Sequence, residues 1–307
     1  MEVLITGGAG FIGSHFVGAL IARGDKVRVL DNLSTGKLSN IEEYASAITF
    51  LEGDIRDGKL TDECVRGCDA VVHLAAVASV QASVDDPLGT HGSNFDGTLN
   101  LLEGCRKHGV ARFIYASSAA VYGDTETIPV AETASLNPLT PYAVDKLSGE
   151  YYLSYFNRQY DLNTTAFRFF NIYGPRQDPS SPYSGVISIF VHRALSNQGV
   201  TIFGDGGQTR DFVYVGDLAA MLVASLDRED MGGAVINLGR GRQTSLLELL
   251  TALESLTGNT IAREFLQARA GDIRHSCADI VRLKKYFDKV PETDIEQGLS
   301  SLLKSIS

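Results

Sequence analysis

Residues 6–13 read TGGAGFIG, directly after a strand expected at Val3–Thr6 and at the start of a helix expected at Phe11–Arg23. Three glycines in this stretch have the spacing of a phosphate-binding turn: Gly7, Gly10 and Gly13. Such glycines allow a tight turn, a close approach of the backbone to a pyrophosphate, and close packing of helix on strand. The helix N-terminus adds unpaired N–H groups and a partial positive charge that favour phosphate. A glycine-rich turn alone can be merely structural, but this strand and helix around it predict a dinucleotide site.

Asp31 follows the second expected strand, Lys26–Leu30, and lies 18 residues beyond Gly13. A carboxylate in this place binds the 2′-hydroxyl of a ribose and repels a 2′-phosphate. The next residues, Asn32 to Ser34, include no Arg that would accommodate a 2′-phosphate. We therefore expect NAD rather than NADP.

Strand and helix signals alternate through the first half of the chain. Further apolar runs of strand character are Ile48–Glu52, Ala70–Leu74, Arg112–Ala116 and Asn163–Phe169. Helical stretches lie between them, at Gly97–His108 and at about Tyr142–Tyr160. Alternating elements of this length predict an α/β protein with a doubly wound parallel sheet of the Rossmann type.

The pattern changes after Asn171. Residues 174–185 are rich in Pro, Gly and Ser, and residues 204–210 are rich in Gly, so both are expected to be loops. The later expected elements are helices at Val186–Ser196, at Leu246–Thr257 and from about Ile295, with a strand at Val235–Leu238. We expect an NAD-binding domain over residues 1–170, to which segments near 207–238 return. A smaller, interleaved C-terminal α/β domain over 171–307 would bind the substrate.

The composition narrows the class of protein. Of the 307 residues, 44% are apolar and 21% charged, which is ordinary for a globular protein, and the net charge of -10 disfavours binding to nucleic acid. The four cysteines form no CxxC pair and have no matching His partners, so we expect reduced thiols and no metal site. No run approaches the ~18–20 apolar residues of a membrane span, and the N-terminus has no basic leader. We expect a cytoplasmic protein without nucleic-acid or membrane partners.

The run at residues 140–146 reads TPYAVDK and carries a second functional pattern. Thr140 can cap a helix, and Pro141 suits the first helical position. Tyr142 and Lys146 are then one turn apart on one face of that helix. Because an ammonium group lowers the pKa of a nearby phenol, the pair is expected to act as acid and base toward a hydroxyl group. The same spacing occurs on many ordinary helices, so its weight here comes from the dinucleotide turn in the same chain.

Together these motifs resemble the extended short-chain dehydrogenase/reductase family, and within it the UDP-glucose and UDP-N-acetylglucosamine 4-epimerase group. The resemblance runs the whole length of the chain. Its further segments are Asp54-Ile55 and residues 73–76 (HLAA), 93–98 (SNFDGT), 116–123 (ASSAAVYG), 168–176 (RFFNIYGPR), 210–217 (RDFVYVGD) and 269–276 (RAGDIRHS). It implies an NAD-dependent isomerase of nucleotide sugars with a place in polysaccharide biosynthesis.

The resemblance also implies which residues bind the ligands. Those expected to contact NAD are Gly7, Gly10, Phe11, Ile12, Gly13, Asp31, Asn32, Asp54, Ile55, Leu74, Ala75, Ala76, Asn94, Ser117, Tyr142, Lys146 and Phe169. Those expected to contact the UDP-sugar are Ser79, Ser118, Asn171, Val186, Thr201, Phe203, Arg210, Arg269, Asp272 and Ser276. Arg210 and Arg269 would bind the diphosphate, where a guanidinium can hold two oxygens at once, unless either forms an ordinary surface ion pair. Phe203 and Thr201 would flank the uracil or its ribose.

The reaction implied by the resemblance begins at Tyr142. This residue would take the proton of the sugar 4-hydroxyl while C4 gives a hydride to NAD, and Ser118 would hydrogen-bond O4. Dehydratases of the family carry Asp-Glu directly after this Ser or Thr, and the related decarboxylases carry Glu at the second of those positions. Ala119 and Ala120 stand there and cannot transfer protons. We therefore expect Tyr142, Lys146 and Ser118 to be the catalytic residues of an epimerase that regenerates NAD in each turnover.

Ser276 bears on the identity of the sugar. A bulky Tyr in this place narrows the space around the sugar 2-substituent, whereas a small residue leaves room for an N-acetyl group. We expect UDP-GlcNAc and UDP-GalNAc as the main pair and UDP-Glc and UDP-Gal as a second pair, unless Ser276 is only a small surface residue. Open alternatives are a uronate epimerase or net reductase of nucleotide sugars, and a non-catalytic NAD-binding regulator.

The family usually forms dimers by packing two helices of each subunit into a four-helix bundle. The candidates here are Gly97–His108 and Tyr142–Tyr160, although their apolar faces could equally belong to the core. We expect a homodimer that binds a UDP-sugar.

Overall fold

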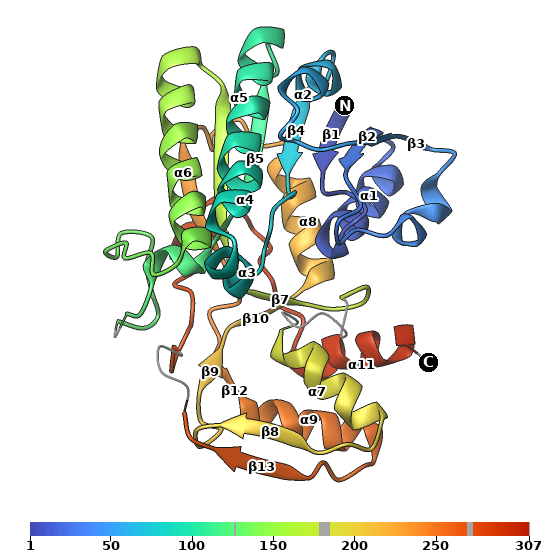
Figure 1. The fold of residues 1–307 in the computed structure, drawn as a ribbon, viewed down its shortest axis with the longest axis vertical. Coiled ribbons are helices and arrows are strands. Elements are labelled where there is room, and N and C mark those ends of the chain that lie inside the picture. The colour runs from blue at the N-terminus through green and yellow to red at the C-terminus, as the bar shows by residue number, and fades with distance from the viewer. Residues whose placement is uncertain (126, 178–184, 269–272, 307) are drawn as a thin grey trace. The chain divides into compact units, whose positions relative to one another are not determined.

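The computed structural model describes residues 1–125, 127–177, 185–268 and 273–306 (Figure 1). The chain divides into two compact units. The first unit consists of Met1–Tyr122, Leu136–Phe169 and Ala219–Ile236, and the second of Gly123–Ser135, Phe170–Leu218 and Asn237–Ser307. Each unit is thus assembled from segments that are distant in sequence.

A seven-stranded sheet organises the first unit. Its strands lie in the order β3 (Ile48–Glu52), β2 (Lys26–Asp31), β1 (Glu2–Thr6), β4 (Ala70–His73), β5 (Arg112–Ser118), β6 (Asn163–Phe169) and β11 (Ala234–Leu238). Pairing from β3 through β6 is parallel. Thr6 pairs with both Leu30 and His73, so the carboxyl ends of the three central strands meet at one edge. The strand order reverses at β1, and open parallel sheets bind ligands at this edge beside such a reversal.

Helices pack against this sheet, and apolar strand residues fill the space beneath them. They are α1 (Phe11–Arg23), α2 (Gly58–Val65), α5 (Gly97–His108), α6 (Pro141–Tyr160) and α8 (Val215–Ser225), whereas α3 (Val80–Asp85) and α4 (Pro87–His91) pack on α6. Figure 1 shows α5 beside α6, and the two helices are in contact. A π-helical turn at Gly92–Asp96 joins α4 to α5. β1 and β4 are almost wholly buried, as expected for a sheet covered on both faces.

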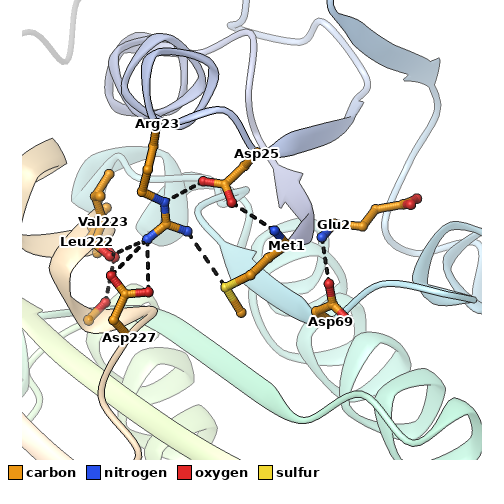
Figure 2. Close-up of polar contacts among 9 residues, drawn as sticks. Met1, Glu2, Arg23, Asp25, Asp69, Leu222, Val223 and Asp227 are labelled. Carbon is orange, nitrogen blue, oxygen red and sulfur yellow. Dashed lines mark hydrogen bonds and ion pairs between the residues drawn. The ribbon is translucent and has the colours of Figure 1, made fainter.

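Arg23, the last residue of α1, connects two parts of the first unit that are 200 residues apart in sequence (Figure 2). Its Nη1 donates to the carbonyl oxygen of Val223 at 3.3 Å and to the carboxylate of Asp227 at 3.1 Å. Its Nε donates to Asp25, whose other oxygen accepts from the N-terminal ammonium of Met1 at 3.0 Å. A cation near the last carbonyls of α8 also complements the helix dipole. These contacts attach the end of α8 to α1.

The described part of the second unit contains three two-stranded sheets and several helices. The strand pairs are β7 (Asn171–Tyr173) with β10 (Phe212–Tyr214), β8 (Val200–Phe203) with β13 (Arg263–Leu266), and β9 (Thr209–Arg210) with β12 (Thr244–Ser245). The helices are α7 (Val186–Leu195), α9 (Leu246–Thr257), α10 (Val281–Tyr286) and α11 (Ile295–Ile306). Helix α9 packs on α7 and α11, and the shared core includes Phe190, Leu249 and Leu299. A capping box of Ser245 and Glu248 starts α9.

The predicted α/β class with a doubly wound parallel sheet is confirmed. The predicted bounds of α1, β3, α5, β6 and α9 are those observed, whereas β5 continues two residues further, to Ser118. The prediction missed α2, α3, α4, α8 and α10, and every strand of the second unit except β11, which spans the boundary. The loop predicted at 174–185 lies partly outside the described residues, and the one at 204–210 ends in β9. Among the residues that the structure describes, no helix has the length and apolar character to span a bilayer.

Candidate cofactor and substrate sites

The glycine turn at residues 6–13 leaves no room for larger side chains at two of its positions. Gly7 has a φ of +72°, and a Cβ there would lie 2.8 Å from the backbone nitrogen of Ala75. A Cβ on Gly13 would lie 2.1 Å from the carbonyl oxygen of Gly7. Gly10 donates its N–H to the same oxygen at 3.1 Å and precedes α1 in an extended conformation. The start of α1 is therefore pressed against the end of β1, with its backbone open to a phosphate.

Asp31, at the end of β2, is held by backbone groups of this turn and of the next loop. Its Oδ2 accepts from the N–H of Ala9 at 2.9 Å, and its Oδ1 accepts from the N–H of Leu33 at 2.8 Å. Burial raises the pKa of the carboxyl group, and the two N–H groups oppose this shift. Each carboxylate oxygen has a second lone pair that can accept from a ribose hydroxyl.

A cavity lies beside the turn and Asp31, within the first unit. The residues expected to contact NAD that line it are Gly7, Gly10, Phe11, Ile12, Gly13, Asp31, Asn32, Asp54, Ile55, Leu74, Ala75 and Ala76. Sequence reasoning missed Leu30, Ser34, Thr35, Gly36, Gly53, Val77, Ala78 and Ser93, which also line it. Four of these eight, Leu30, Gly53, Val77 and Ser93, directly adjoin an expected NAD contact in the sequence, so that position was the available signal for them. The close-packed glycines, the helix N-terminus and the buried carboxylate together fit an NAD molecule.

Asn32 and Asp54 form a polar pair at this cavity. The Nδ2 of Asn32 donates to Asp54 Oδ2 at 2.9 Å. Arg56 also donates to the Asp54 carboxylate, and it holds the pKa of that carboxyl well below its usual range. An ionised Asp54 is therefore present to accept from a donor such as the adenine amino group.

The expected helix start at Thr140 is observed. Thr140 Oγ1 accepts from the N–H of Ala143 at 3.4 Å, and Pro141 is the first residue of α6. This start places Tyr142 in the first turn and Lys146 one turn later.

Tyr142, Lys146 and Ser118 lie together at the carboxyl end of β5. Lys146 Nζ lies 5.9 Å from the ring centre of Tyr142 and 4.8 Å from the ring centre of Tyr115. Ser118, the last residue of β5, acts on the Tyr142 phenol and opposes part of the rise in its pKa. Because Ala120 donates its N–H to Ser118 Oγ at 3.2 Å, the hydroxyl hydrogen of Ser118 is available to the phenol oxygen.

The pKa directions in this group correct one expectation. Burial raises the pKa of the Tyr142 phenol, and the hydrogen bond with Ser118 opposes that shift only in part. Burial also lowers the pKa of Lys146 to about 7, against the opposing charge of Asp145. The expected net lowering of the Tyr142 pKa is not seen, because burial outweighs the effect that a neighbouring ammonium would have. Removal from water disfavours the charged form of both groups, and that effect is the larger one.

Buried hydrogen bonds hold the end of β4 beneath the cavity. Thr6 Oγ1 lies 2.7 Å from His73 Nδ1, and His73 Nε2 lies 2.9 Å from Thr98 Oγ1. Burial lowers the pKa of His73 to about 3, so its ring is neutral. Asn94 binds the backbone of Val77 twice, accepting its N–H at 2.8 Å and donating to its carbonyl at 3.1 Å. Asn94 is not among the cavity-lining residues; it supports the cavity wall instead.

Ser117 has a different partner from the one expected. Its hydroxyl donates to Glu150, whose carboxylate is paired with Arg168 at 2.6 Å. Arg168 also donates to the Tyr122 hydroxyl at 2.8 Å, and this whole cluster is buried. Neither Ser117 nor the buried Phe169 lines the cavity. The hydroxyl hydrogen of Ser117 is used to bind Glu150 rather than a cofactor.

A second cavity lies within the second unit. The residues expected to contact the UDP-sugar that line it are Asn171, Val186, Thr201, Phe203 and Arg210. Sequence reasoning missed Ile189, Phe190, Arg193, Val200, Gln208 and Leu246. The first three of these follow Val186 at helical spacing, so the face of α7 was the available signal.

The second cavity combines apolar walls with fixed polar groups. Phe190, Val200 and Leu246 are buried in its walls. Gln208 Nε2 donates to the carbonyl of Phe203 at 2.8 Å, and Arg210 Nη1 donates to the carbonyl of Thr209 at 2.9 Å. Apolar walls suit a flat base, and a guanidinium suits a diphosphate.

Two further expected substrate residues, Ser79 and Ser276, are not among the described residues that line either cavity. Ser79 caps α3, with its hydroxyl accepting from the N–H of Ala82 at 3.0 Å. Ser276 is half-buried and donates its N–H to the carbonyl of Thr209 at 3.2 Å, which places it beside β9. The other two, Arg269 and Asp272, lie outside the described residues.

Comparisons with known proteins identify relatives along the whole chain. The model of the NAD dependent epimerase/dehydratase family matches residues 3–239. A protein of Methanocaldococcus jannaschii named putative UDP-glucose 4-epimerase is 39% identical over 303 residues, which are 98% of this chain and 97% of the relative.

Two solved structures extend the comparison to bound ligands. UDP-N-acetylglucosamine 4-epimerase from Methanobrevibacter ruminantium M1, in complex with UDP-N-acetylmuramic acid, has a TM-score of 0.95 at 38% identity, covering 99% of this chain and 97% of its own. UDP-glucuronic acid 4-epimerase from Bacillus cereus, in complex with UDP-glucuronic acid and NAD, has a TM-score of 0.90 at 33% identity, covering 100% and 99%.

Proposed function

We propose that this chain inverts C4 of a UDP-hexose. The premise is that the chain belongs to the NAD dependent epimerase/dehydratase family and is an epimerase that uses NAD. The observation that carries the proposal is the grouping of Tyr142, Lys146 and Ser118 in the unit that also contains the glycine turn. The names of the three relatives support C4 as the carbon that is inverted, because each of them is named a 4-epimerase. The name of the Methanocaldococcus jannaschii protein carries the word putative.

Each of the three side chains has a role that its contacts support. Bound NAD supplies a hydride acceptor and a cationic ring. Tyr142, as the phenolate, takes the proton of the 4-hydroxyl while the hydride leaves C4, which oxidises the alcohol to a 4-ketone. Tyr142 returns that proton after the hydride comes back to the opposite face of the sugar. Ser118 hydrogen-bonds O4, and the Lys146 ammonium stabilises the phenolate.

The residues after Ser118 favour epimerisation over elimination. Ala119 and Ala120 occupy the turn that follows β5 and have no group that transfers a proton. A reaction that ends with the cofactor in its starting oxidation state needs no such group. We assign NAD to the cavity of the first unit and the UDP moiety to that of the second.

NMR of the products tests this function. Purified protein is incubated, without added reductant, with UDP-Glc, UDP-Gal, UDP-GlcNAc, UDP-GalNAc or UDP-glucuronic acid. We expect 4-epimers to form with at least one pair, and Tyr142→Phe to bind NAD but lose nearly all turnover. Conversion only when NADH is supplied and consumed would contradict the proposal and favour a reductase. Turnover of UDP-glucuronic acid alone would make the chain a uronate epimerase.

For the sugar, we propose UDP-GlcNAc and UDP-GalNAc as the main pair. Ser276 supports this, since it is small and lies beside the strand that carries Arg210. Ser276→Tyr is expected to lower kcat/KM for the N-acetylated pair about tenfold or more, because pocket shape alone discriminates modestly, and to spare UDP-Glc. The control Ser276→Ala should leave both pairs unchanged. An unchanged ratio in Ser276→Tyr would contradict this choice of sugar.

We also propose that α6 forms a homodimer contact. Val144, Tyr151 and Tyr155 are exposed on this helix, Tyr151 to 61%, and their spacing places them on one stripe. Sedimentation should give a dimer for the wild type and a monomer for Tyr151→Glu. Leu256→Glu, on an exposed site of α9, is the control and should stay dimeric. A monomeric wild type would contradict the proposal.

A further inference from the structure

Tyr115, on β5, is a fully buried aromatic residue that contacts Lys146, and the epimerase chemistry described above does not use it. The ammonium nitrogen of Lys146 lies over the Tyr115 ring, 4.8 Å from the ring centre. Its distance to the ring centre of Tyr142 is larger, at 5.9 Å. A cation this close to the face of an aromatic ring is attracted by the ring's electron density, most strongly where water is excluded. Tyr115 is therefore the nearer of two rings that the described residues present to this ammonium.

Gly149 makes this contact possible. Lys146 and Gly149 are three residues apart on α6, so they lie on one face of the helix. A Cβ on Gly149 would lie 2.5 Å from the phenol oxygen of Tyr115 and 2.7 Å from its Cζ. The ring of His73, on β4, also packs against Tyr115, with ring centres 5.7 Å apart. The backbone of α6 and the His73 ring thus hold Tyr115 in a fixed place beneath Lys146.

The other titratable groups near this contact leave a role for the ring. Those that act on Lys146 or Tyr115 are His73 on β4, and Tyr142, Asp145 and Glu150 on α6. The first two are uncharged, because burial lowers the pKa of His73 to about 3 and raises that of Tyr142. The two carboxylates have partners of their own, at His91 and Arg168. Burial lowers the pKa of Lys146 to about 7, so a contact that favours its charged form has an effect near neutral pH.

We propose that Tyr115 is a positioning residue whose ring face holds the Lys146 ammonium, charged and in place, beside Tyr142. The inference rests on the proposed epimerase function, in which this ammonium stabilises the Tyr142 phenolate. A ring is suited to this task because it stabilises the cation without a negative charge. A carboxylate in the same place would repel the phenolate that Lys146 has to stabilise.

Graded fluorination separates the electron density of the ring from its shape. Position 115 carries phenylalanine (Tyr115→Phe) or its 4-fluoro, 3,5-difluoro or 3,4,5-trifluoro derivative, incorporated at this position alone. Each fluorine withdraws electron density from the ring face and weakens its attraction for a cation, while the ring keeps nearly the same size. The same series at Phe113 is the matched control. Phe113 is fully buried on the same strand, and its ring contacts the neutral His73.

The protonation midpoint of Lys146 is measured in NAD-saturated protein, by NMR of lysine labelled at Cε, and Lys146→Arg identifies the signal. We expect the midpoint to fall stepwise from the phenylalanine to the trifluoro form at position 115, by on the order of one unit in total. The alkaline limb of the kcat pH profile should move to lower pH by the same amounts. The Phe113 series should leave both quantities unchanged.

A constant midpoint along the series at position 115 would overturn the inference. Equal shifts in the two series would also overturn it, because they would indicate only a general disturbance of the core. If the wild type epimerises no UDP-sugar but the midpoint still follows the series at position 115, the proposed function fails and the contact of ring and ammonium stands.

Discussion

Replacing Gly13 by Ala tests whether close packing in the glycine turn creates the NAD site. A methyl group on Gly13 would lie 2.1 Å from the carbonyl oxygen of Gly7 and 2.7 Å from Cα of Gly8. An ordinary contact of a Cβ atom begins at 3.4 Å, so the nearest atoms must separate by about 1.3 Å. Both neighbours are backbone atoms, which cannot rotate away as a side chain would. The start of α1 must therefore move away from β1.

The size of the effect follows from this displacement. Overpacking of a well-packed site costs about 1–3 kcal/mol, and a clash with the backbone of two residues places Gly13→Ala near the upper end, at about 3 kcal/mol of unfolding free energy. Movement of the α1 N-terminus by about an ångström also displaces the N–H groups that face the phosphate. We expect NAD affinity to fall at least tenfold, which corresponds to about 1.4 kcal/mol.

Gly10→Ala is the matched control in the same turn. A Cβ on Gly10 would meet one atom, the Gly7 carbonyl oxygen, at 3.2 Å, and its φ of -77° suits any residue. We expect a change in unfolding free energy of about 0.5 kcal/mol or less, as at sites without a severe clash. NAD binding should still weaken, because Gly10 lines the cavity. Urea unfolding of nucleotide-free protein and calorimetric titration with NAD measure the two effects. A Gly13→Ala variant with wild-type unfolding and wild-type NAD affinity would refute the reasoning.

Four further substitutions test the packing and electrostatics of the first unit. Glu150→Gln should lower the unfolding free energy by about 3–5 kcal/mol, because it leaves Arg168 buried without its counter-charge. Ser117→Ala should lower it by only about 1 kcal/mol. Urea unfolding measures both values, and equal losses in the two variants would contradict the importance of the ion pair. Lys146 has a pKa of about 7 in the fold against 10.5 ordinarily, so the unfolded chain binds more protons between these values and wild-type stability rises with pH there. Lys146→Met should lack that rise and be more stable than wild type below pH 7, as denaturation at several pH values would reveal. Asp227→Asn should change stability by at most about 1 kcal/mol, since the Asp227 side chain is 68% exposed, and a larger loss in thermal unfolding would contradict this.

The N-terminal strand, turn and helix were predictable because their determinants are local. Because α1 starts close to the end of β1, only glycine fits at position 13. Gly24, with a φ of +88°, ends α1. Continuous apolar runs such as β4 can only be buried strands at their length. These features need no knowledge of distant residues, so the bounds of α1 and the places of the sheet strands, to within one or two residues, followed from the sequence.

The strands of the second unit were not predictable for the opposite reason. β9 and β12 are two residues long, and they exist because Arg210 and Thr244 meet from distant segments. β13 is exposed along its whole length, so it carries no apolar alternation. Pairing across the chain, rather than local preference, creates such elements.

Ser117, which was expected to contact NAD, has its side-chain partner elsewhere in the fold, and the reason is physical. The contact with NAD was expected because Ser117 lies near the carboxyl end of β5, where residues line the cofactor site. Side chains alternate along a strand, however, so neighbouring residues point to opposite faces. Ser118 therefore reaches Tyr142, while Ser117 points to Glu150 and Arg168. The ion pair that takes the Ser117 hydroxyl joins residues of α6 and β6, which only the fold brings together.

Tyr142 and Lys146 show what spacing predicts and what burial decides. Spacing on α6 predicts that Tyr142 and Lys146 are neighbours, and they are. The charge of each group depends on water, and water is excluded by residues such as Tyr115 that belong to another element. A buried lysine either loses its proton or has a counter-charge close by. The run YAVDK places Lys146 one turn after Tyr142, but the burial of the lysine depends on the rest of the fold.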